Sequence, residues 1–267
     1  MSEPVPVGRW GDLRKRVFSA IVMVAVGAFE IWVGGLPFDA FAIVVTGVMI
    51  WELAGMTAPW KEGSPVQLGF NAVVSLGLAL ILNPMIALVV LLCPAAAFLA
   101  TERRDRVLAA IYSVAIMFAG YGLVQLRTET GISVIVWVIA VVVASDVLGY
   151  FAGRMLGGPK FWPKVSPKKT WSGTIAGWIG AALVGAGFVW FGGADWLLVP
   201  VSVLVAFAGQ MGDIAESWVK RRAGVKDASN LIPGHGGVLD RFDALIGAVV
   251  VIQLVGLVVP VATLIGG

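Results

Sequence analysis

Residues 132–151 read ISVIVWVIAVVVASDVLGYF, a run in which Asp146 is the only charged side chain. A helix rises about 1.5 Å per residue, so about 20 apolar residues cross the hydrocarbon core of a bilayer. Ionisable groups are costly in hydrocarbon and usually mark a functional position. The run therefore predicts a membrane-spanning helix that carries a carboxylate of functional interest.

Similar apolar runs fill most of the chain. Hydrophobic residues make up 59% of the 267 residues and charged residues 13%, whereas soluble domains have about 45–50% and about 25%. This composition excludes a soluble globular enzyme, a disordered chain and a secreted disulfide scaffold. We predict an all-α, polytopic membrane helix bundle with about nine transmembrane helices, in the runs 17–35, 38–57, 67–83, 84–101, 107–126, 132–151, 173–193, 195–216 and 241–265.

The basic residues separate by side when these runs cross the membrane alternately. All of the 19 lysines and arginines except Arg127 then fall on the side of the N-terminus. The positive-inside rule places that side in the cytoplasm and the C-terminus outside. We expect residues 1–130 to form a membrane scaffold, and residues 131–267 to form a catalytic membrane region with cytoplasmic polar loops.

Cysteine and histidine are scarce. Cys93 is the single cysteine and lies in an apolar run, so no intrachain disulfide is possible and a cysteine zinc site is not expected. The single histidine, His235, excludes a cluster of several histidines around a metal.

Five carboxylates lie toward the predicted cytoplasmic ends of three runs: Asp146, Asp213, Glu216, Asp240 and Asp243. A spacing of three places Asp213 with Glu216, and Asp240 with Asp243, on one face of a helix. Carboxylates that converge repel each other, and a hard cation such as Mg²⁺ relieves the repulsion because it prefers oxygen ligands. We predict a divalent metal held by Asp146, Asp213, Asp240 and Asp243.

Other interpretations of the acidic residues stay open. Lys220 and Arg241 would neutralise the carboxylates as ordinary ion pairs if no metal binds. Glu30 and Glu52 stand alone in the first two runs, where we expect a hydrogen bond between helices or a position near the lipid headgroups.

Two polar segments follow these runs. Residues 153–173 place cations, hydroxyls and glycines before a predicted helix start, which is a ready anion site. A basic anchor for anionic lipid would explain the lysines, but it does not explain the order of Ser166, Pro167 and Thr170. Residues 212–243 contain Gly234, Gly236 and Gly237, whose backbone amides are free to wrap an anion.

This combination of cations, glycines and carboxylates suits phosphoryl or nucleotidyl transfer, which depends on positioning and charge neutralisation. A pair of cations can clamp the attacking and leaving oxygens. His235 is either a turn donor or a catalytic base. Ser217 has no neighbouring base in the sequence, so we expect a phosphate contact or a bond to its own helix instead of nucleophilic catalysis.

The motifs resemble a known family. The pattern Ser217-x-x-Lys220-Arg221-x4-Lys226-Asp227, followed by Pro233-x-His235-Gly236-Gly237-x-x-Asp240-Arg241-x-Asp243, resembles the signature of the phosphatidate cytidylyltransferase (CDP-diacylglycerol synthase) family. The blocks at 146–154 and 166–170 are similar to two further blocks of that family. The resemblance covers about residues 145–245. Ser172 departs from it, because many members have an acidic residue there, which puts a metal or substrate role for this position in doubt.

The resemblance implies that CTP and phosphatidic acid are converted to CDP-diacylglycerol and pyrophosphate, with Mg²⁺ and possibly a second cation as cofactors. It also implies a polytopic fold, a bacterial cytoplasmic membrane, an active site that faces the cytoplasm, a homodimer in many members, and no nucleic-acid partner. The expected catalytic residues are Asp213, Asp240, Asp243, Lys226 and Asp227. The expected substrate-binding residues are Arg154, Lys164, Ser166, Lys168, Lys169, Thr170, Ser217, Lys220, Arg221, His235, Gly236, Gly237 and Arg241.

Three other functions suit this sequence less well. A CDP-alcohol phosphotransferase usually carries an Asp-Gly-x-x-Ala-Arg block, which the sequence lacks, and a CTP-dependent lipid kinase would give different products. A transporter would place its charges at mid-membrane in a repeated fold. Separately, Gly173, Gly177, Ala181 and Gly185 recur every four residues, which predicts close helix packing within one subunit or between two.

Overall fold

The computed structural model describes residues 9–58 and 65–266, with side chains from Arg16 onward in the first helix. The side chains of Arg9, Arg14 and Lys15, and the whole of Lys61, lie outside the described residues. Eleven helices and one small hairpin make up the described part: α1 (Arg9–Val33), α2 (Gly35–Thr57), α3 (Pro65–Ile81), α4 (Pro84–Val90), α5 (Cys93–Ala100), α6 (Arg106–Thr130), α7 (Ile132–Met155), β1 (Lys160–Trp162), β2 (Ser166–Thr170), α8 (Trp171–Gly192), α9 (Leu198–Ala223), α10 (Leu239–Gly256) and α11 (Val261–Ile265).

The all-α, polytopic class is confirmed. Six helices of the described chain are long and apolar enough to cross a membrane, judged by length and composition: α1 from Arg16, α2, α6, α7, α8 and α9. The other three predicted runs correspond to shorter or more polar helices. α3 and the segment Pro84–Ala100 are shorter apolar helices, and the 18 residues of α10 include Asp240, Arg241 and Asp243. Nine complete crossings therefore stay a prediction.

Proline explains two breaks in the predicted runs. The run 84–101 divides into α4 and α5, and Pro94 occupies the first turn of α5. The run 241–265 ends as a helix at Gly256, and the short α11 begins after Pro260. Proline has no backbone N–H and clashes with the preceding turn, so a continuous helix is not favoured at either place.

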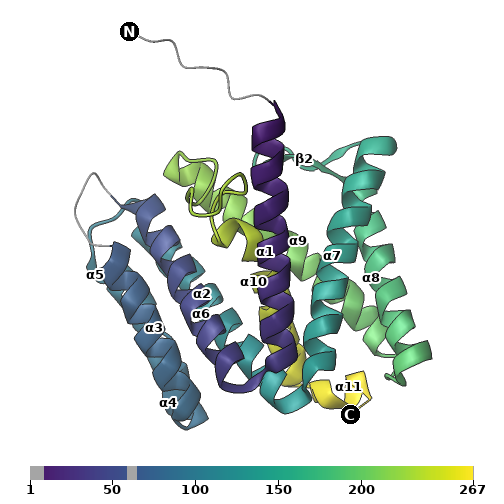
Figure 1. Cartoon of the computed structure of the whole chain (residues 1–267), viewed down its shortest axis with the longest axis horizontal. Helices are drawn as coiled ribbons and strands as arrows, with labels where there is room; N and C mark the ends of the chain where they lie inside the picture. The colour runs from purple at the N-terminus through teal and green to yellow at the C-terminus, as the bar shows by residue number, and fades with distance from the viewer. Residues whose placement is uncertain (1–8, 59–64, 267) are drawn as a thin grey trace.

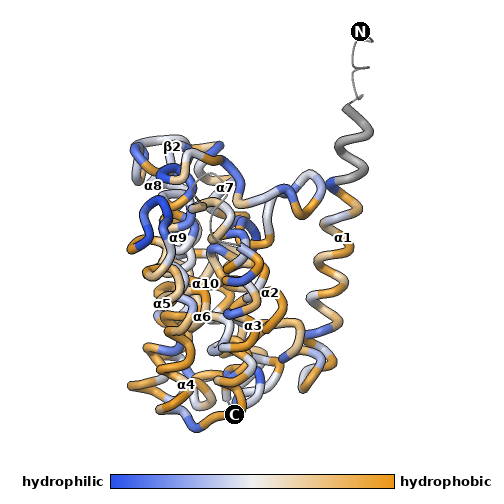
Figure 2. Tube along the Cα trace, turned by 90° about the vertical axis from the view of Figure 1, so that its left-hand side faces the viewer, coloured by the Kyte–Doolittle hydropathy of each residue, from blue (hydrophilic) through white to orange (hydrophobic). Residues whose placement is uncertain are grey.

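The helices form a bundle with one polar end. α1 begins at the end that holds β2, and α11 lies at the opposite end (Figure 1). Figure 2 shows hydrophilic residues gathered around the β2 end and hydrophobic residues along the helices. Arg127 differs from the other basic residues, since it ends α6 at the far end and donates to Ile31 O at 3.1 Å. This arrangement agrees with the predicted separation of basic residues by side.

An ion pair fixes the start of α6 at the polar end. Asp105 has a left-handed backbone conformation (φ 52°), which aspartate tolerates better than most residues. Its carboxylate accepts two hydrogen bonds from Arg222 at the end of α9, at 2.9 and 2.6 Å. These bonds hold the pKa of Asp105 below its usual range.

Small residues let α8 pack tightly within this chain. Gly173, Gly177, Ala181 and Gly185 are all buried. A Cβ atom added at Gly173 would lie 2.5 Å from the carbonyl oxygen of Gly149 on α7. The stripe therefore serves packing inside one subunit, which is the first of its two predicted roles, and a homodimer stays a prediction.

Candidate active site

Close packing of α9 and α10 brings three carboxylates together. Asp213 and Glu216 share one face of α9, and Asp243 lies on the first turns of α10. Each offers an oxygen within 4.8 Å of the other two. A side chain at Gly212 would collide with the carbonyl of Asp243, so the glycine permits the approach. We call Asp213, Glu216 and Asp243 the acidic triad.

Glu216 is the most deeply buried member of the acidic triad. Its exposed fraction is 0%. Glu216 forms an ion pair with Lys220, one turn further along α9, at 2.5 Å. Its other oxygen, Oε1, has no hydrogen-bond partner among the described residues, and the same holds for the buried hydroxyl of Tyr112 on α6. A buried carboxylate with unused lone pairs is costly unless a cation completes its surroundings.

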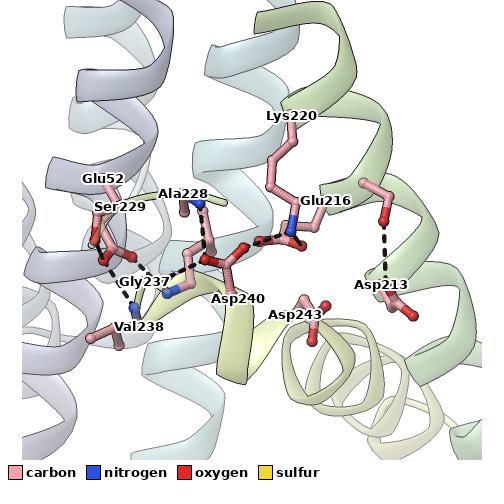
Figure 3. A network of polar contacts seen from close by, with 12 residues as sticks. Glu52, Asp213, Glu216, Lys220, Ala228, Ser229, Gly237, Val238, Asp240 and Asp243 are labelled. Atoms are coloured by element: carbon pink, nitrogen blue, oxygen red, sulfur yellow. Dashed lines mark hydrogen bonds and ion pairs between the residues drawn. The ribbon is translucent and has the colours of Figure 1, made fainter. Parts of the chain in front are cut away.

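Lys220 connects the acidic triad to Asp240. Its ammonium also contacts Asp240 Oδ1 at 2.6 Å, so it lies between two carboxylates (Figure 3). Asp240 Oδ2 accepts hydrogen bonds from the backbone amides of Ala228 (2.9 Å) and Gly237 (2.7 Å). The interpretation of Asp240 as an ion-pair partner of Lys220 is thus confirmed, whereas Arg241 is exposed.

The predicted metal ligands are only partly brought together. Asp213 and Asp243 belong to the acidic triad, which can hold a metal ion, and Glu216 joins them although it was not among the predicted ligands. Asp240 has three acceptor positions occupied by the protein, and a carboxylate has about four. Asp146 on α7 is exposed and lies outside the group of three. Ligand roles for Asp146 and Asp240 stay predictions.

The basic segment after α7 reaches the acidic triad through one lysine. β1 and β2 pair as an antiparallel hairpin, and Lys169 on β2 contacts Asp213 Oδ2 at 2.5 Å. Thr170 caps α8 by accepting a hydrogen bond from the amide of Gly173 at 3.2 Å. The predicted helix start after polar residues is confirmed. Lys164 and Lys168 are exposed and Ser166 is half-buried, so their substrate roles stay predictions.

Ser172 has a structural partner. Its hydroxyl donates to the carbonyl of Gly157 and lies 3.0 Å from Thr170 Oγ1. These bonds fasten the turn after α7 to the start of α8. Arg154, on the last turn of α7, donates to the hydroxyl of Tyr150 at 2.8 Å and is otherwise exposed.

The glycine-rich segment uses its amides within the protein. His235 and Gly236 donate to the carbonyl of Ile232, and Gly237 donates to Asp240. His235 Nδ1 lies 2.8 Å from the hydroxyl of Ser19 on α1. The amides of Gly236 and Gly237, two of the three glycines expected to wrap an anion, thus have acceptors within the protein. Contact of this segment with a phosphate stays a prediction.

Ser217 and the remaining cations were also expected at the site. Ser217 donates to Asp213 Oδ1, a side chain one turn earlier on α9, at 3.3 Å, and its contact with a phosphate stays a prediction. Arg221, Lys226 and Asp227 are exposed on the end of α9 and the following segment. Their catalytic or binding roles stay predictions.

Glu52 is a residue whose partners the sequence did not indicate. It lies on α2 and is 1% exposed. Its carboxylate accepts hydrogen bonds from the Ser229 hydroxyl (2.6 Å) and from the amides of Val238 (2.9 Å) and Leu239 (2.6 Å). The expected hydrogen bond between helices is confirmed, since Glu52 on α2 accepts from the first amides of α10. Its isolation in an apolar run was the available signal, but the sequence did not show that the donors are backbone amides at a helix start.

Comparison with known proteins agrees with this site. The model of the cytidylyltransferase family matches residues 14–259. A phosphatidate cytidylyltransferase of Brucella abortus biovar 1 (strain 9-941) is 34% identical over 256 residues, which are 92% of this chain and 93% of that protein. Proteins of the same name from Staphylococcus saprophyticus subsp. saprophyticus and Helicobacter pylori are 40% and 37% identical over 51% and 56% of this chain, and 54% and 56% of their own lengths. The chain therefore belongs to the cytidylyltransferase family and, as in the phosphatidate cytidylyltransferases, is a nucleotidyltransferase enzyme.

Proposed function

We propose that this chain transfers the cytidylyl group of CTP to phosphatidic acid, with CDP-diacylglycerol and pyrophosphate as products, at the cytoplasmic face of a bacterial membrane. The main support is the acidic triad, which lies beside Lys169 and Lys220 where an apolar bundle meets its polar end. CTP is a soluble trianionic or tetraanionic substrate and phosphatidic acid is confined to the bilayer. Both can reach a site at such a boundary.

The donor set of the acidic triad fits Mg²⁺. This ion prefers oxygen ligands, and one or two carboxylates with substrate phosphates usually complete its shell. One oxygen from each triad residue lies within 4.8 Å of the other two, and Glu216 Oε1 lacks a hydrogen-bond partner in the described part of the chain. Asp213, Glu216 and Asp243 would hold the ion, with Asp240 and Asp146 as further candidate ligands. When bound, Mg²⁺ supplies neutralisation of phosphate charge, and a second cation is compatible with this number of carboxylates.

The cations of the chain bind and orient the phosphates. The candidates at the polar end are Arg154, Lys164, Lys168, Lys169, Lys220, Arg221, Lys226 and Arg241. A phosphate oxygen of phosphatidic acid attacks the α-phosphorus of CTP in line. The bond from that phosphorus to the bridging oxygen breaks, and pyrophosphate leaves with the electron pair. The attacking phosphate is ionised at neutral pH, so the step needs no strong general base.

The division of labour along the chain is part of the proposal. Residues 131–267 supply the acidic triad and the cations, and residues 1–130 act mainly as a scaffold. The family resemblance makes a homodimer the expected assembly. The scaffold is not passive, however, because α2 contributes Glu52 and α6 contributes Tyr112 next to the site.

A product assay with purified protein tests the proposal. We expect pyrophosphate release from CTP only when phosphatidic acid and Mg²⁺ are both present, and one CDP-diacylglycerol per pyrophosphate. Release of CMP would indicate a CDP-alcohol phosphotransferase, and formation of CDP with a phosphorylated lipid would indicate a lipid kinase. Either result would contradict the proposal. EDTA should abolish turnover, and added Mg²⁺ should restore it.

A matched pair of variants tests the acidic triad. Asp213→Asn should lower turnover by on the order of a hundredfold or more, because Asp213 would hold the metal ion that neutralises the phosphate charge, and an interaction of several kcal/mol in the transition state is lost with it. Asp195→Asn changes an exposed aspartate between α8 and α9 and should keep wild-type turnover. Equal activity of both variants would remove the triad from the proposal.

A further inference from the structure

Glu52 belongs to the N-terminal half of the chain, yet its hydrogen bonds go to the segment that carries the site. Its partners lie 177 to 187 residues further along the chain. Two of the three donors, the amides of Val238 and Leu239, stand at the very start of α10. The first amides of a helix have no partner inside the helix, and a carboxylate that accepts from them is favoured by the helix dipole.

The start of α10 has no cap of its own. Val238 occupies the cap position, and its side chain cannot accept a hydrogen bond. Glu52 performs this task from another helix, α2, by accepting from the amides of Val238 and Leu239. The next two charged residues of α10 are Asp240 and Arg241, and Asp243 of the acidic triad follows within one turn.

A second carboxylate holds the same segment from the other side. Asp240 Oδ2 accepts from Ala228 and Gly237, and Asp240 Oδ1 contacts Lys220. Lys220 in turn contacts Glu216 of the acidic triad. Residues 228–239 thus lie between Glu52 and Asp240 (Figure 3). A displacement of this segment from Glu52 would change the position of Asp240 and of the lysine that it shares with Glu216.

Gly237 shows how closely the two sides approach. A Cβ atom at this position would lie 2.6 Å from Glu52 Oε1 and 2.9 Å from Glu52 Oε2. The backbone at Gly237 therefore rests directly against the Glu52 carboxylate. Gly237 does not have a left-handed backbone conformation. A glycine is therefore needed here for the close contact with Glu52 and not for its backbone angles.

We propose that Glu52 is a positioning residue of the cytidylyl transfer: it holds residues 228–239 so that Asp240 and Lys220 keep the acidic triad in its reactive geometry. This inference rests on the proposed function. Glu52 is 1% exposed, and its carboxylate accepts three hydrogen bonds from the segment. It acts through the segment and not by contact with CTP or lipid.

Glu52→Gln is the primary variant. The amide keeps one acceptor oxygen but replaces the other by a donor, which cannot pair with the amide of Val238 or Leu239. We expect kcat to fall by about tenfold or more, and the Mg²⁺ concentration for half-maximal activity to rise. Hydrogen exchange of a peptide that covers 228–239 should be faster than in the wild type. Glu30→Gln is the matched control, because it removes a lone carboxylate from α1 without touching this segment, and it should change none of these quantities.

Ser229→Ala keeps the test valid if Glu52→Gln fails to fold. It removes one of the three donors and leaves the carboxylate in place, so kcat should fall less than in Glu52→Gln. The double variant should lose no more activity than Glu52→Gln alone, because the two side chains act through one hydrogen bond.

Three results would overturn the inference: kcat of folded Glu52→Gln within twofold of the wild type, a lower melting temperature with unchanged kcat, or additive losses in the double variant. The wild-type product assay is run beside each variant. A wild type that makes no CDP-diacylglycerol refutes the proposed function, whereas an active wild type with an equally active Glu52→Gln refutes only the role of Glu52.

Discussion

At the scale of single residues, Lys220 decides how four carboxylates coexist. Its ammonium pairs with Glu216 and Asp240, while Lys169 pairs with Asp213. Among the residues that the structure describes, Asp243 accepts a hydrogen bond from the amide of Ala244 alone. Two lysines therefore leave at least one carboxylate of the acidic triad without a counter-charge. This deficit is what the proposed divalent cation would correct.

Asp240→Asn tests the link between Lys220 and the segment 228–239. An asparagine cannot accept from Ala228, Gly237 and Lys220 as the carboxylate does, because one of its two polar atoms is a donor. We expect turnover of folded protein to fall by on the order of a hundredfold, since each lost bond to a charged group is worth about 1.5–3 kcal/mol. The measurement is Mg²⁺-dependent pyrophosphate release in detergent. Undiminished turnover would show that Asp240 serves neither as a ligand nor as an anchor.

Gly237→Ala tests the contact between Gly237 and Glu52. The added methyl group has no room beside the carboxylate, so we expect a destabilised segment and lower turnover. Overpacking of this kind costs about 1–3 kcal/mol. The same substitution in a Glu52→Ala background should cost less, because the colliding atoms are gone. Thermal unfolding and turnover of the four proteins check this, and an equal cost in both backgrounds would contradict the contact.

The sequence predicted which charged residues lie together at the candidate site better than it predicted their partners. Asp213, Lys220, Asp240 and Asp243 follow from charge, spacing and motif. The acceptor role of Glu52 does not follow from the sequence. Its partners include backbone amides of a segment remote in the chain, and every residue except proline has such an amide, so no pattern of side chains indicates them. Glu216 was recognised as an acidic neighbour of Asp213, but its inclusion in the acidic triad depends on the approach of α9 to α10 at Gly212.

At the scale of elements, the packing of α8 against its neighbours explains the stripe of small residues. Gly173 faces Gly149 of α7, and Gly177 faces Ser145 and Gln210. Gln210 Nε2 donates to Ser145 Oγ at 3.2 Å, and its Oε1 accepts from Trp178 at 3.1 Å. A spacing of four predicted that these residues share a face. Only the structure shows which helices cover that face.

Gly173→Ala and Gly187→Ala separate packing from helix propensity. Both glycines lie on α8, but a Cβ at Gly173 would collide with the backbone of α7, and a Cβ at Gly187 would meet nothing within 4 Å. We expect Gly173→Ala to lower the free energy of unfolding by about 1–3 kcal/mol. Gly187→Ala should leave it unchanged or raise it by up to about 1 kcal/mol. Melting temperatures in detergent give the comparison, and a similar decrease for both variants would mean that the α7–α8 contact is not tight.

The broken helices mark the limit of prediction from hydropathy. Apolar length alone merged α4 with α5, and α10 with α11, into continuous runs. Proline and local hydrogen bonds end these helices early, and a hydropathy average contains no information on either. The class of the fold was nevertheless predictable, because the composition admits few alternatives to helices packed in lipid.

At the scale of the whole molecule, the polar end of the bundle collects residues from both halves of the chain. α2 supplies Glu52, and α9 and α10 supply the acidic triad. Arg127, the exception among the basic residues, lies at the opposite end near α1 and α2. The segregation of charge thus extends over the entire bundle and was predictable from the sequence, since it requires only the order of apolar runs and basic residues.

We predict that the polar end of the bundle faces the cytoplasm. The positive-inside rule places it on this side of the membrane, where CTP is available.

Cys93 is the single cysteine, so a Cys93→Ser background allows one cysteine to be placed at either end of the bundle. Lys160→Cys marks the hairpin at the polar end, and Trp196→Cys marks the connection between α8 and α9. Both positions are exposed. A membrane-impermeant maleimide applied to intact spheroplasts should label the Trp196→Cys protein at once. It should label the Lys160→Cys protein only after the membrane is permeabilised, while complete labelling of both in denaturant controls for reactivity. The reverse pattern would place the acidic triad outside the cell, away from CTP, and the proposed reaction would then fail for lack of its nucleotide whatever the chemistry of the site.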